Sequence, residues 1–68
     1  MNLKALEEKI TASGLKKKHI ASTLGISSQG LINKLSGVYD FTRKEVNELC
    51  RLLDITDLEE KESIFFDD

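Results

Sequence analysis

The sequence predicts an all-α domain, a compact bundle of five short helices. Apolar residues recur at the three- and four-residue spacing of helices, and no alternating run is long enough to form a strand. The chain contains no proline, and Gly14, Gly25 and Gly37 fall between the periodic segments. Because 68 residues suffice for one domain, residues 1–68 are expected to form a single unit.

The first expected helix starts close to the N-terminus. Leu3, Leu6 and Ile10 share one of its faces. Asn2 is a suitable N-cap, because its side-chain oxygen can accept a hydrogen bond from a backbone N–H of the first turn. Gly14 is a stop signal, because glycine readily adopts the left-handed conformation that follows many helices.

The second and third expected helices are separated only by the stretch LGIS. The apolar residues of the second helix are Ile20, Ala21 and Leu24. It ends at Gly25, which can adopt the left-handed conformation at a corner. Ser27 or Ser28 can cap the third helix, which runs through QGLINKLS to Gly37. A short glycine-containing turn between two short helices indicates a helix-turn-helix, here at about residues 17–36.

The fourth helix is expected to begin at Thr42, since Thr42 and Glu45 have the spacing of a capping box. Its apolar positions follow the i, i+3, i+4, i+7 pattern of a buried stripe formed by Val46, Leu49, Cys50 and Leu53. Thr56 or Asp57 can cap a brief fifth helix, with acidic residues in its first turn.

The two phenylalanines near the C-terminus have two interpretations. Phe65 and Phe66 either fold back over the groove between the first and fourth helices or form a dimer contact. The domain has only three Phe and no Trp. Closing this small core is therefore the role we expect for both rings.

The charge of the chain is unevenly distributed. The net charge of the whole chain is −2. Residues 1–53 contain nine basic and five acidic residues, a net charge of +4, whereas residues 54–68 contain one lysine and seven acidic residues, a net charge of −6. A mildly basic body with an acidic C-terminal tail is compatible with a nucleic-acid partner despite the negative total.

Two of the expected helices begin with basic residues. A helix N-terminus carries roughly +0.5 charge, so each cation there is unfavourable by ~0.3–1 kcal/mol. A bound anion offsets this cost, and phosphate is the natural candidate. The plainer interpretation is that these lysines are merely solvated. The basic residues that we expect to neutralise DNA phosphates are Lys16, Lys17, Lys18, Lys34, Arg43 and Lys44.

The third helix has an uncharged outer face on which three of the four side chains are polar. This face is formed by Ser28, Gln29, Ile32 and Asn33. Gln can pair with adenine N6 and N7, Ser with several base edges, and an apolar side chain with a thymine methyl, so we expect these four residues to contact bases in the major groove. Gly30 costs the helix ~1 kcal/mol relative to Ala. That cost is explained if a Cβ would strike either DNA or the neighbouring helix, and the sequence leaves both causes open.

Four stretches resemble the lambda-repressor-like (Cro/C1-type) helix-turn-helix family. They are IASTLGIS, LINKLSG, DFTRKEVNELCRLLDI and the closing IFF, which together span roughly residues 3–66. More narrowly, the chain is similar to short regulators of temperate phages and integrated elements of Gram-positive bacteria. The resemblance implies a DNA-binding domain that acts on double-stranded operator DNA in a lysogeny switch, usually as a homodimer on a near-palindrome.

The resemblance also assigns roles to individual positions. Lys17 stands where the family often has a phosphate-binding Gln. The positions that the family uses for base contacts are Ser28, Gln29 and Asn33. The loop after Gly37, which contains Tyr39, and the start of the fourth helix fall on positions that contact the DNA backbone.

Two functions remain open at this stage. The first is a sequence-specific DNA-binding transcriptional regulator of a phage lysogeny switch. Because residues 1–68 have no counterpart of the large oligomerisation domain of full repressors, we expect a protein similar to the Cro type or to an antirepressor (modulator of repression) that binds the cognate phage repressor. The net acidity and the absence of Arg from the outer face favour the antirepressor, whereas the basic clusters favour direct DNA binding.

We expect no enzymatic activity, no cofactor and no metal site. His19 and Cys50 are the single histidine and cysteine. Cys50 lies on the apolar stripe of the fourth helix, and His19 follows three lysines on an exposed face. The sequence contains no metal-ligand cluster and no Walker-type loop. A lone thiol suits a reducing compartment and no apolar run approaches the ~20 residues of a membrane span, so we expect a cytoplasmic protein of the host bacterial cell without a membrane partner.

Overall fold

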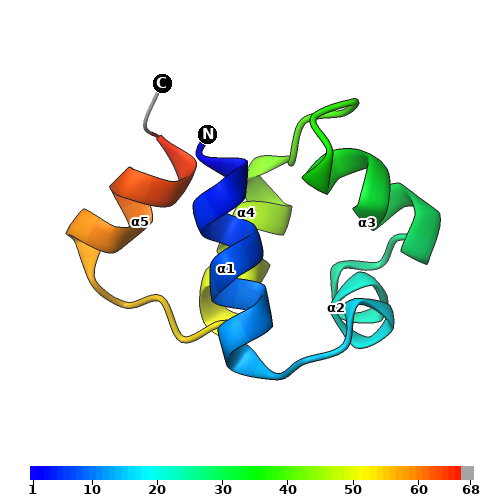
Figure 1. Ribbon diagram of the computed structural model, residues 1–68, viewed down its shortest axis with the longest axis horizontal. Coiled ribbons are helices and arrows are strands. Elements are labelled where there is room, and N and C mark those ends of the chain that lie inside the picture. Colours follow the sequence, from blue (N-terminus) through cyan, green and yellow to red (C-terminus); the bar gives the residue numbers. More distant parts are fainter. Residues whose placement is uncertain (67–68) are drawn as a thin grey trace.

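The computed structural model describes residues 1–66, which fold into five α-helices with no strand among them (Figure 1). The helices are α1 (Leu3–Ser13), α2 (Lys17–Leu24), α3 (Ser28–Leu35), α4 (Arg43–Leu52) and α5 (Leu58–Phe65). In Figure 1, α1 lies in front of α4 in the middle of the view, with α5 on the left and α2 and α3 on the right. The predicted all-α class is confirmed.

Side-chain caps at the starts of α1 and α4 confirm two of the predicted helix boundaries. Asn2 Oδ1 accepts a hydrogen bond from the Ala5 backbone N–H at 3.0 Å. At α4 the capping box is complete, because Thr42 Oγ1 accepts from the Glu45 N–H at 3.2 Å. In return, Glu45 Oε1 accepts from the Thr42 N–H at 2.8 Å. These bonds satisfy backbone donors that have no partner within a helix.

The structure also resolves the two caps that the sequence left open. Ser27 is the N-cap of α3, since its hydroxyl oxygen accepts from the Gly30 N–H at 3.0 Å, and Ser28 is the first residue of the helix. Asp57 is the N-cap of α5, and its carboxylate accepts from the Glu59 N–H at 3.1 Å.

A very short connection joins α2 to α3, and the two helices pack against each other. Gly25 ends α2 with φ +76°, a left-handed conformation that non-glycine residues rarely adopt. The next residue closes the corner, because the Ile26 N–H donates to the Ala21 carbonyl oxygen at 3.0 Å. The predicted role of Gly25 is confirmed.

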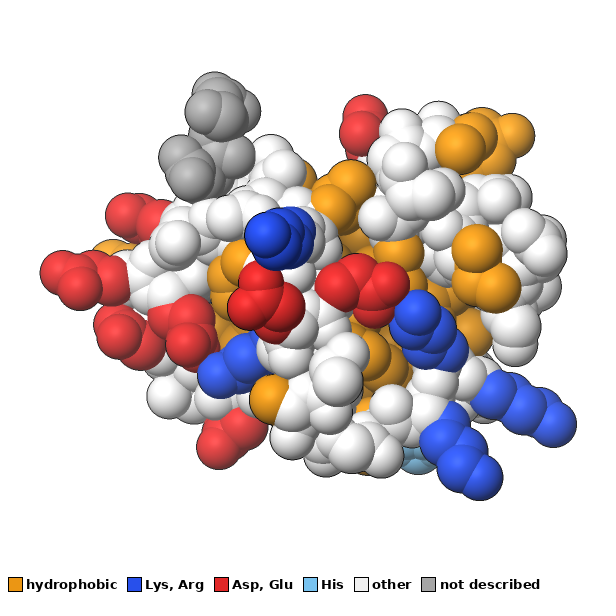
Figure 2. Space-filling model, viewed as in Figure 1, with side chains coloured by type: hydrophobic (Ala, Val, Ile, Leu, Met, Phe, Trp, Pro, Cys, Tyr) orange, Lys and Arg blue, Asp and Glu red, His pale blue; other side chains and the backbone are white. Residues whose placement is uncertain are grey.

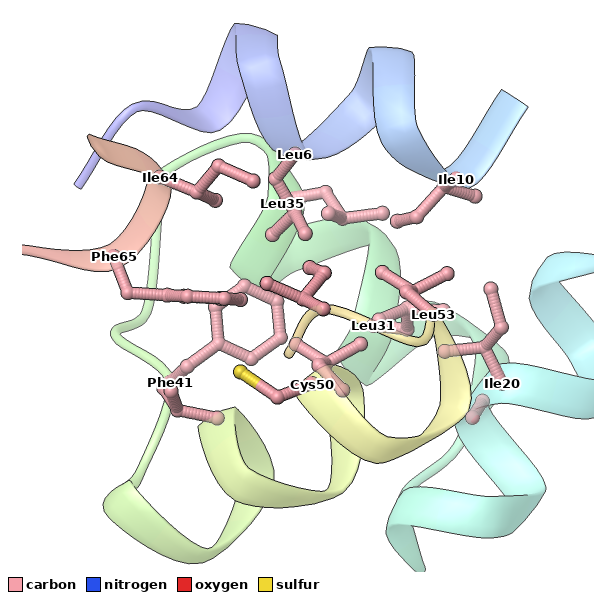
Figure 3. Packing of buried hydrophobic residues seen from close by; sticks show 14 residues of the cluster. Leu6, Ile10, Ile20, Leu31, Leu35, Phe41, Cys50, Leu53, Ile64 and Phe65 are labelled. Atoms are coloured by element: carbon pink, nitrogen blue, oxygen red, sulfur yellow. The ribbon is translucent and has the colours of Figure 1, made fainter. Parts of the chain in front are cut away.

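One hydrophobic core joins all five helices (Figure 3). The predicted stripe of α4 is buried in it, and α3 contributes only Leu31 and Leu35. The core residues are Leu6, Ile10, Ile20, Ala21, Leu31, Leu35, Phe41, Val46, Leu49, Cys50, Leu53, Ile55, Ile64 and Phe65. Because each helix has only 8 to 11 residues, this shared burial must supply most of its stability.

The acidic C-terminal segment is a packed helix for most of its described length. Its apolar side is anchored by Ile64 and Phe65, and the Asn2 N–H donates to the Ile64 carbonyl oxygen at 2.7 Å. The last two acidic residues of the predicted tail, Asp67 and Asp68, lie outside the described residues.

The expectation that both phenylalanines close the core is correct for Phe65 and wrong for Phe66. The Phe65 side chain is 5% exposed, and its ring points into the core from the same side as Phe41 (Figure 3). Phe66 follows the last turn of α5 and is 63% exposed. Phe66 is the C-cap of α5, and its φ of −121° is not helical, so its side chain does not continue the face that buries Ile64 and Phe65. For Phe66 the dimer contact stays a prediction.

We predict that Phe65→Ala lowers the free energy of unfolding by about 3–5 kcal/mol, because a large buried ring is lost and a cavity remains. The matched variant Phe66→Ala should change it by no more than about 0.5 kcal/mol. Urea unfolding followed by circular dichroism measures both values. Equal losses for the two variants would contradict the burial assigned to the two rings.

Candidate nucleic-acid interface

Helix α3 has a buried side and an exposed side. Leu31 is completely buried and Leu35 nearly so, which fixes the inner side against the core. Ser28, Gln29 and Ile32 are exposed on the other side, and Asn33 is half-buried. The structure therefore brings together on one outer face the four residues that the sequence analysis assigned to base contacts: Ser28, Gln29, Ile32 and Asn33.

Two of these residues are hydrogen-bonded to each other. Gln29 Nε2 donates to Asn33 Oδ1 at 3.1 Å across one helical turn. This bond uses one of the two N–H groups of Gln29 and leaves its carbonyl oxygen and second N–H free to bind a partner. An amide with a donor and an acceptor side by side can pair with the N6 and N7 of adenine. The pairing of Gln29 with Asn33 thus restricts the direction in which that amide points.

Gly30 is explained by the cap of its own helix. A Cβ at this position would lie 3.2 Å from Ser27 Oγ and 3.8 Å from Ile26 Cβ. Ser27 Oγ is also the atom that accepts the Gly30 N–H, so a larger residue would crowd the N-cap. Of the two causes considered from the sequence, contact with a neighbouring helix is wrong. The nearest atoms belong to the turn that starts α3.

The start of α2 is a cluster of exposed cations. Lys16, Lys17 and Lys18 are all exposed, and Lys16 is an N-cap without a side-chain hydrogen bond to the helix. Lys17 Nζ lies 3.1 Å from Glu7 Oε2, and both side chains of this pair remain largely exposed. An exposed pair of this kind contributes little stability, so Lys17 stays available for another anion. Figure 2 shows blue side chains projecting at the end of the molecule where α2 lies.

The start of α4 is a second basic site. Arg43 and Lys44 occupy its first turn, and both are exposed. Neither forms an ion pair with a carboxylate of residues 1–66. Each therefore adds positive charge to a helix end that already carries a partial positive charge.

Lys34 differs from the other predicted phosphate-binding residues because its side chain is partly buried and paired with a carboxylate. Its Nζ forms an ion pair with Glu45 Oε1 at 2.5 Å, and the two side chains are only 15% and 10% exposed. The same ammonium group lies 5.9 Å from the centre of the Phe41 ring. Because the charge of Lys34 is already neutralised in a partly buried pair, we leave Lys34 out of the proposed phosphate-contacting set.

The Lys34–Glu45 pair connects the outer helix to the start of α4. Glu45 Oε1 accepts from both Lys34 and the Thr42 backbone, so one carboxylate oxygen joins α3 to the α4 capping box. Burial alone would raise the pKa of Glu45, but the hydrogen bonds from Lys34 and Thr42 outweigh it and lower the pKa below its usual value. The sequence analysis identified the capping box and missed this pair.

The loop after α3 presents two exposed apolar side chains. Val38 is 65% and Tyr39 is 60% exposed, and the Val38 N–H donates to the Asn33 carbonyl oxygen at 2.9 Å. This bond holds the loop against the end of α3. Ile32, which lies on the outer face of α3, is a further exposed apolar side chain, at 47%.

Acidic side chains lie at the opposite end of the molecule. Red side chains gather over α5 on the left of Figure 2, away from the blue side chains near α2. Glu59 and Glu62 are exposed there, and Glu60 pairs with Lys9 of α1. The chain is therefore electrically polarised, with α5 as its negative end.

The remaining candidate groups show no clustering. Cys50 is buried, and burial raises the pKa of its thiol, which keeps it protonated. His19 is exposed. Within residues 1–66, His, Cys, Asp and Glu side chains form no group of three or more that could hold a metal ion. Every helix in this part of the chain is too short or too polar to span a bilayer.

Comparison of the chain with protein-family models, with curated proteins and with solved structures finds no match.

We predict that Glu45 makes unfolding more sensitive to acid. A carboxylate whose pKa is lowered in the folded state stabilises the fold above its unfolded pKa, and this stability is lost as the pH falls through the folded value. The melting temperature of the wild type should therefore exceed that of Glu45→Gln at about pH 6, and the difference should shrink below the ordinary Glu pKa of about 4.3. Glu8→Gln, at an exposed position, is the control and should keep the wild-type pH dependence. A constant difference between Glu45→Gln and wild type would contradict the lowered pKa.

Proposed function

We propose that this protein is a sequence-specific double-stranded DNA-binding transcriptional regulator, of the kind found in the lysogeny switches of temperate phages. The observation that carries the proposal is the outer face of α3, on which the exposed Gln29 and the half-buried Asn33 are hydrogen-bonded to each other. Side chains without charge are suited to base edges, whereas a face meant only for water would normally carry Glu and Lys.

In this proposal, α2 and α3 act as the two helices of a helix-turn-helix. The outer face of α3 enters the major groove, where Ser28, Gln29, Ile32 and Asn33 contact bases. The exposed cations at the starts of α2 and α4 contact phosphates, which position the protein without reading sequence. The proposed phosphate-contacting residues are Lys16, Lys17, Lys18, Tyr39, Arg43 and Lys44.

The resemblance to lambda-repressor-like domains supports the same assignment, since it covers nearly the whole chain. The uneven distribution of charge over the molecule also supports the assignment to DNA binding. A negative end at α5 and positive clusters at α2 and α4 would turn the α3 side toward a polyanion during approach. We also propose, from the resemblance alone, a homodimer on a near-palindromic operator.

An antirepressor is the second candidate, and one observation favours it. Ile32 on the outer face and Val38 and Tyr39 in the loop that follows α3 are exposed apolar side chains, as expected of a surface that binds a protein. In this case the same face would contact the cognate phage repressor. Charged-to-neutral changes at the start of α2 would then leave the complex with that repressor largely intact.

We predict distinct effects for two variants in the DNA-binding assay. A preferred sequence is first selected from a random duplex library, and binding to it and to random duplex is measured by fluorescence anisotropy. Gln29→Ala should cost about 1–3 kcal/mol of discrimination and leave binding to random duplex unchanged. Lys17→Ala should weaken binding to both duplexes alike and reduce the log–log salt slope by about 0.9.

The control for this assay is Lys9→Gln. It also removes one positive charge, but from the side of α1 that pairs with Glu60 of α5, and it should leave the salt slope unchanged. If Gln29→Ala and Lys17→Ala behaved alike on both duplexes, the division into base and phosphate contacts would be wrong.

We predict that the wild-type protein alone binds duplex DNA with a steep salt dependence. The repressor of the same genetic element is tested in parallel by size-exclusion chromatography. Failure to bind any duplex alone, together with a stable complex with the repressor that Ile32→Asp abolishes, would replace the first candidate by the second.

A further inference from the structure

A groove of about 410 Å³ lies between the start of α4 and the end of α5, on a different surface from the outer face of α3. The exposed edges of Phe41, Val46 and Phe65 form its apolar lining, although most of each of these residues belongs to the core. Met1 and Phe66, which are 39% and 63% exposed, extend the apolar surface at its edge. A groove of this size can hold one aromatic or branched side chain of a partner.

The charged residues that line this groove are both basic. They are Arg43 at the first position of α4 and Lys61, which is the only basic residue of α5. No carboxylate of residues 1–66 lines the groove or forms an ion pair with either of them. The positive end of the α4 dipole adds to the same potential. In a chain with net charge −2, this apolar groove is therefore locally positive.

We propose that this groove binds an acidic peptide segment of a partner protein, with an aromatic or branched apolar side chain as the anchor. The apolar lining argues against a nucleic-acid backbone as the occupant, because phosphates and sugars offer no side chain to fill it. The positive charges of Arg43 and Lys61 attract carboxylates, so the peptide residues on either side of the anchor are Asp or Glu. Arg43 also belongs to the proposed phosphate-contacting set, so an occupied groove would compete with DNA for this side chain. That consequence rests on the proposed function, whereas peptide binding does not.

The test is a titration of the full-length, ¹⁵N-labelled protein with the blocked peptide Asp-Glu-Phe-Leu-Asp-Glu, followed by amide chemical shifts. The largest shifts are expected at residues 43–47 and 61–66. Two control peptides test the contribution of the acidic residues and that of the apolar anchor separately. Replacing the four acids by Asn and Gln, or the Phe-Leu anchor by Ala-Ala, should each weaken binding by about ten-fold.

Variants of the protein provide matched controls. Lys61→Gln should weaken binding of the acidic peptide by about five-fold, because one of the two rim charges is lost. Lys9→Gln removes the same charge from the α1–α5 pair and should leave binding unchanged. Both positions are on the surface of helices, and circular dichroism confirms that each variant is folded.

Several outcomes would overturn the proposal. The first is equal binding of acidic and neutral peptides, or shifts centred on the lysines of α2, which would indicate unspecific attraction between charges. The second is a change of the groove signals on dilution of the protein alone, which would make a second copy the occupant. The third is a ten-fold gain in peptide affinity for the double variant Asp67→Asn and Asp68→Asn, which would make the chain's own terminus the occupant.

Discussion

None of the five helices in residues 1–66 is long enough to be stable by itself, and this constraint shapes the rest of the structure. Helices of 8 to 11 residues are marginal in water as isolated peptides. Each one must therefore bury apolar side chains against the others in a single core. Helix α3 meets this requirement with only Leu31 and Leu35. Because Leu31 and Leu35 supply its contacts with the core, the other side chains of α3 are not needed for that core.

The partly buried ion pair between Lys34 and Glu45 fixes the position of the outer face of α3 relative to α4. Glu45 caps its own helix through Thr42 and accepts a hydrogen bond from Lys34 of α3 through the same oxygen. The pair thus couples the helix proposed to read bases to the helix end proposed to hold phosphate. Lys34, a basic residue that the sequence alone would assign to phosphate, is engaged in this ion pair between α3 and α4.

The local features of the fold could be predicted from the sequence. Asn2, Gly25 and the Thr42–Glu45 box act within one turn of their own position, so spacing alone identifies them. The α4 stripe was equally predictable, because its period is that of a helix and its burial follows from the apolar residue types.

Features that depend on tertiary contact could not be predicted. Lys34 and Glu45 are 11 residues apart on two helices joined by a loop, and no local pattern indicates that they meet. The expectation that both Phe65 and Phe66 close the core failed for Phe66, because this residue lies just past the end of α5, where helical periodicity no longer applies. The outer face of α3 was predicted correctly as a surface, whereas its hydrogen bond between Gln29 and Asn33 required coordinates.

The proposed DNA binding requires that the outer face of α3 and two separate basic helix ends contact the same duplex. The most direct measurement is the amide chemical-shift map of the labelled protein on addition of duplex DNA. The predicted result is a set of large changes at residues 16–18, 28–33 and 43–44, with α5 unaffected. Changes confined to one basic cluster, or centred on α5, would contradict the claim.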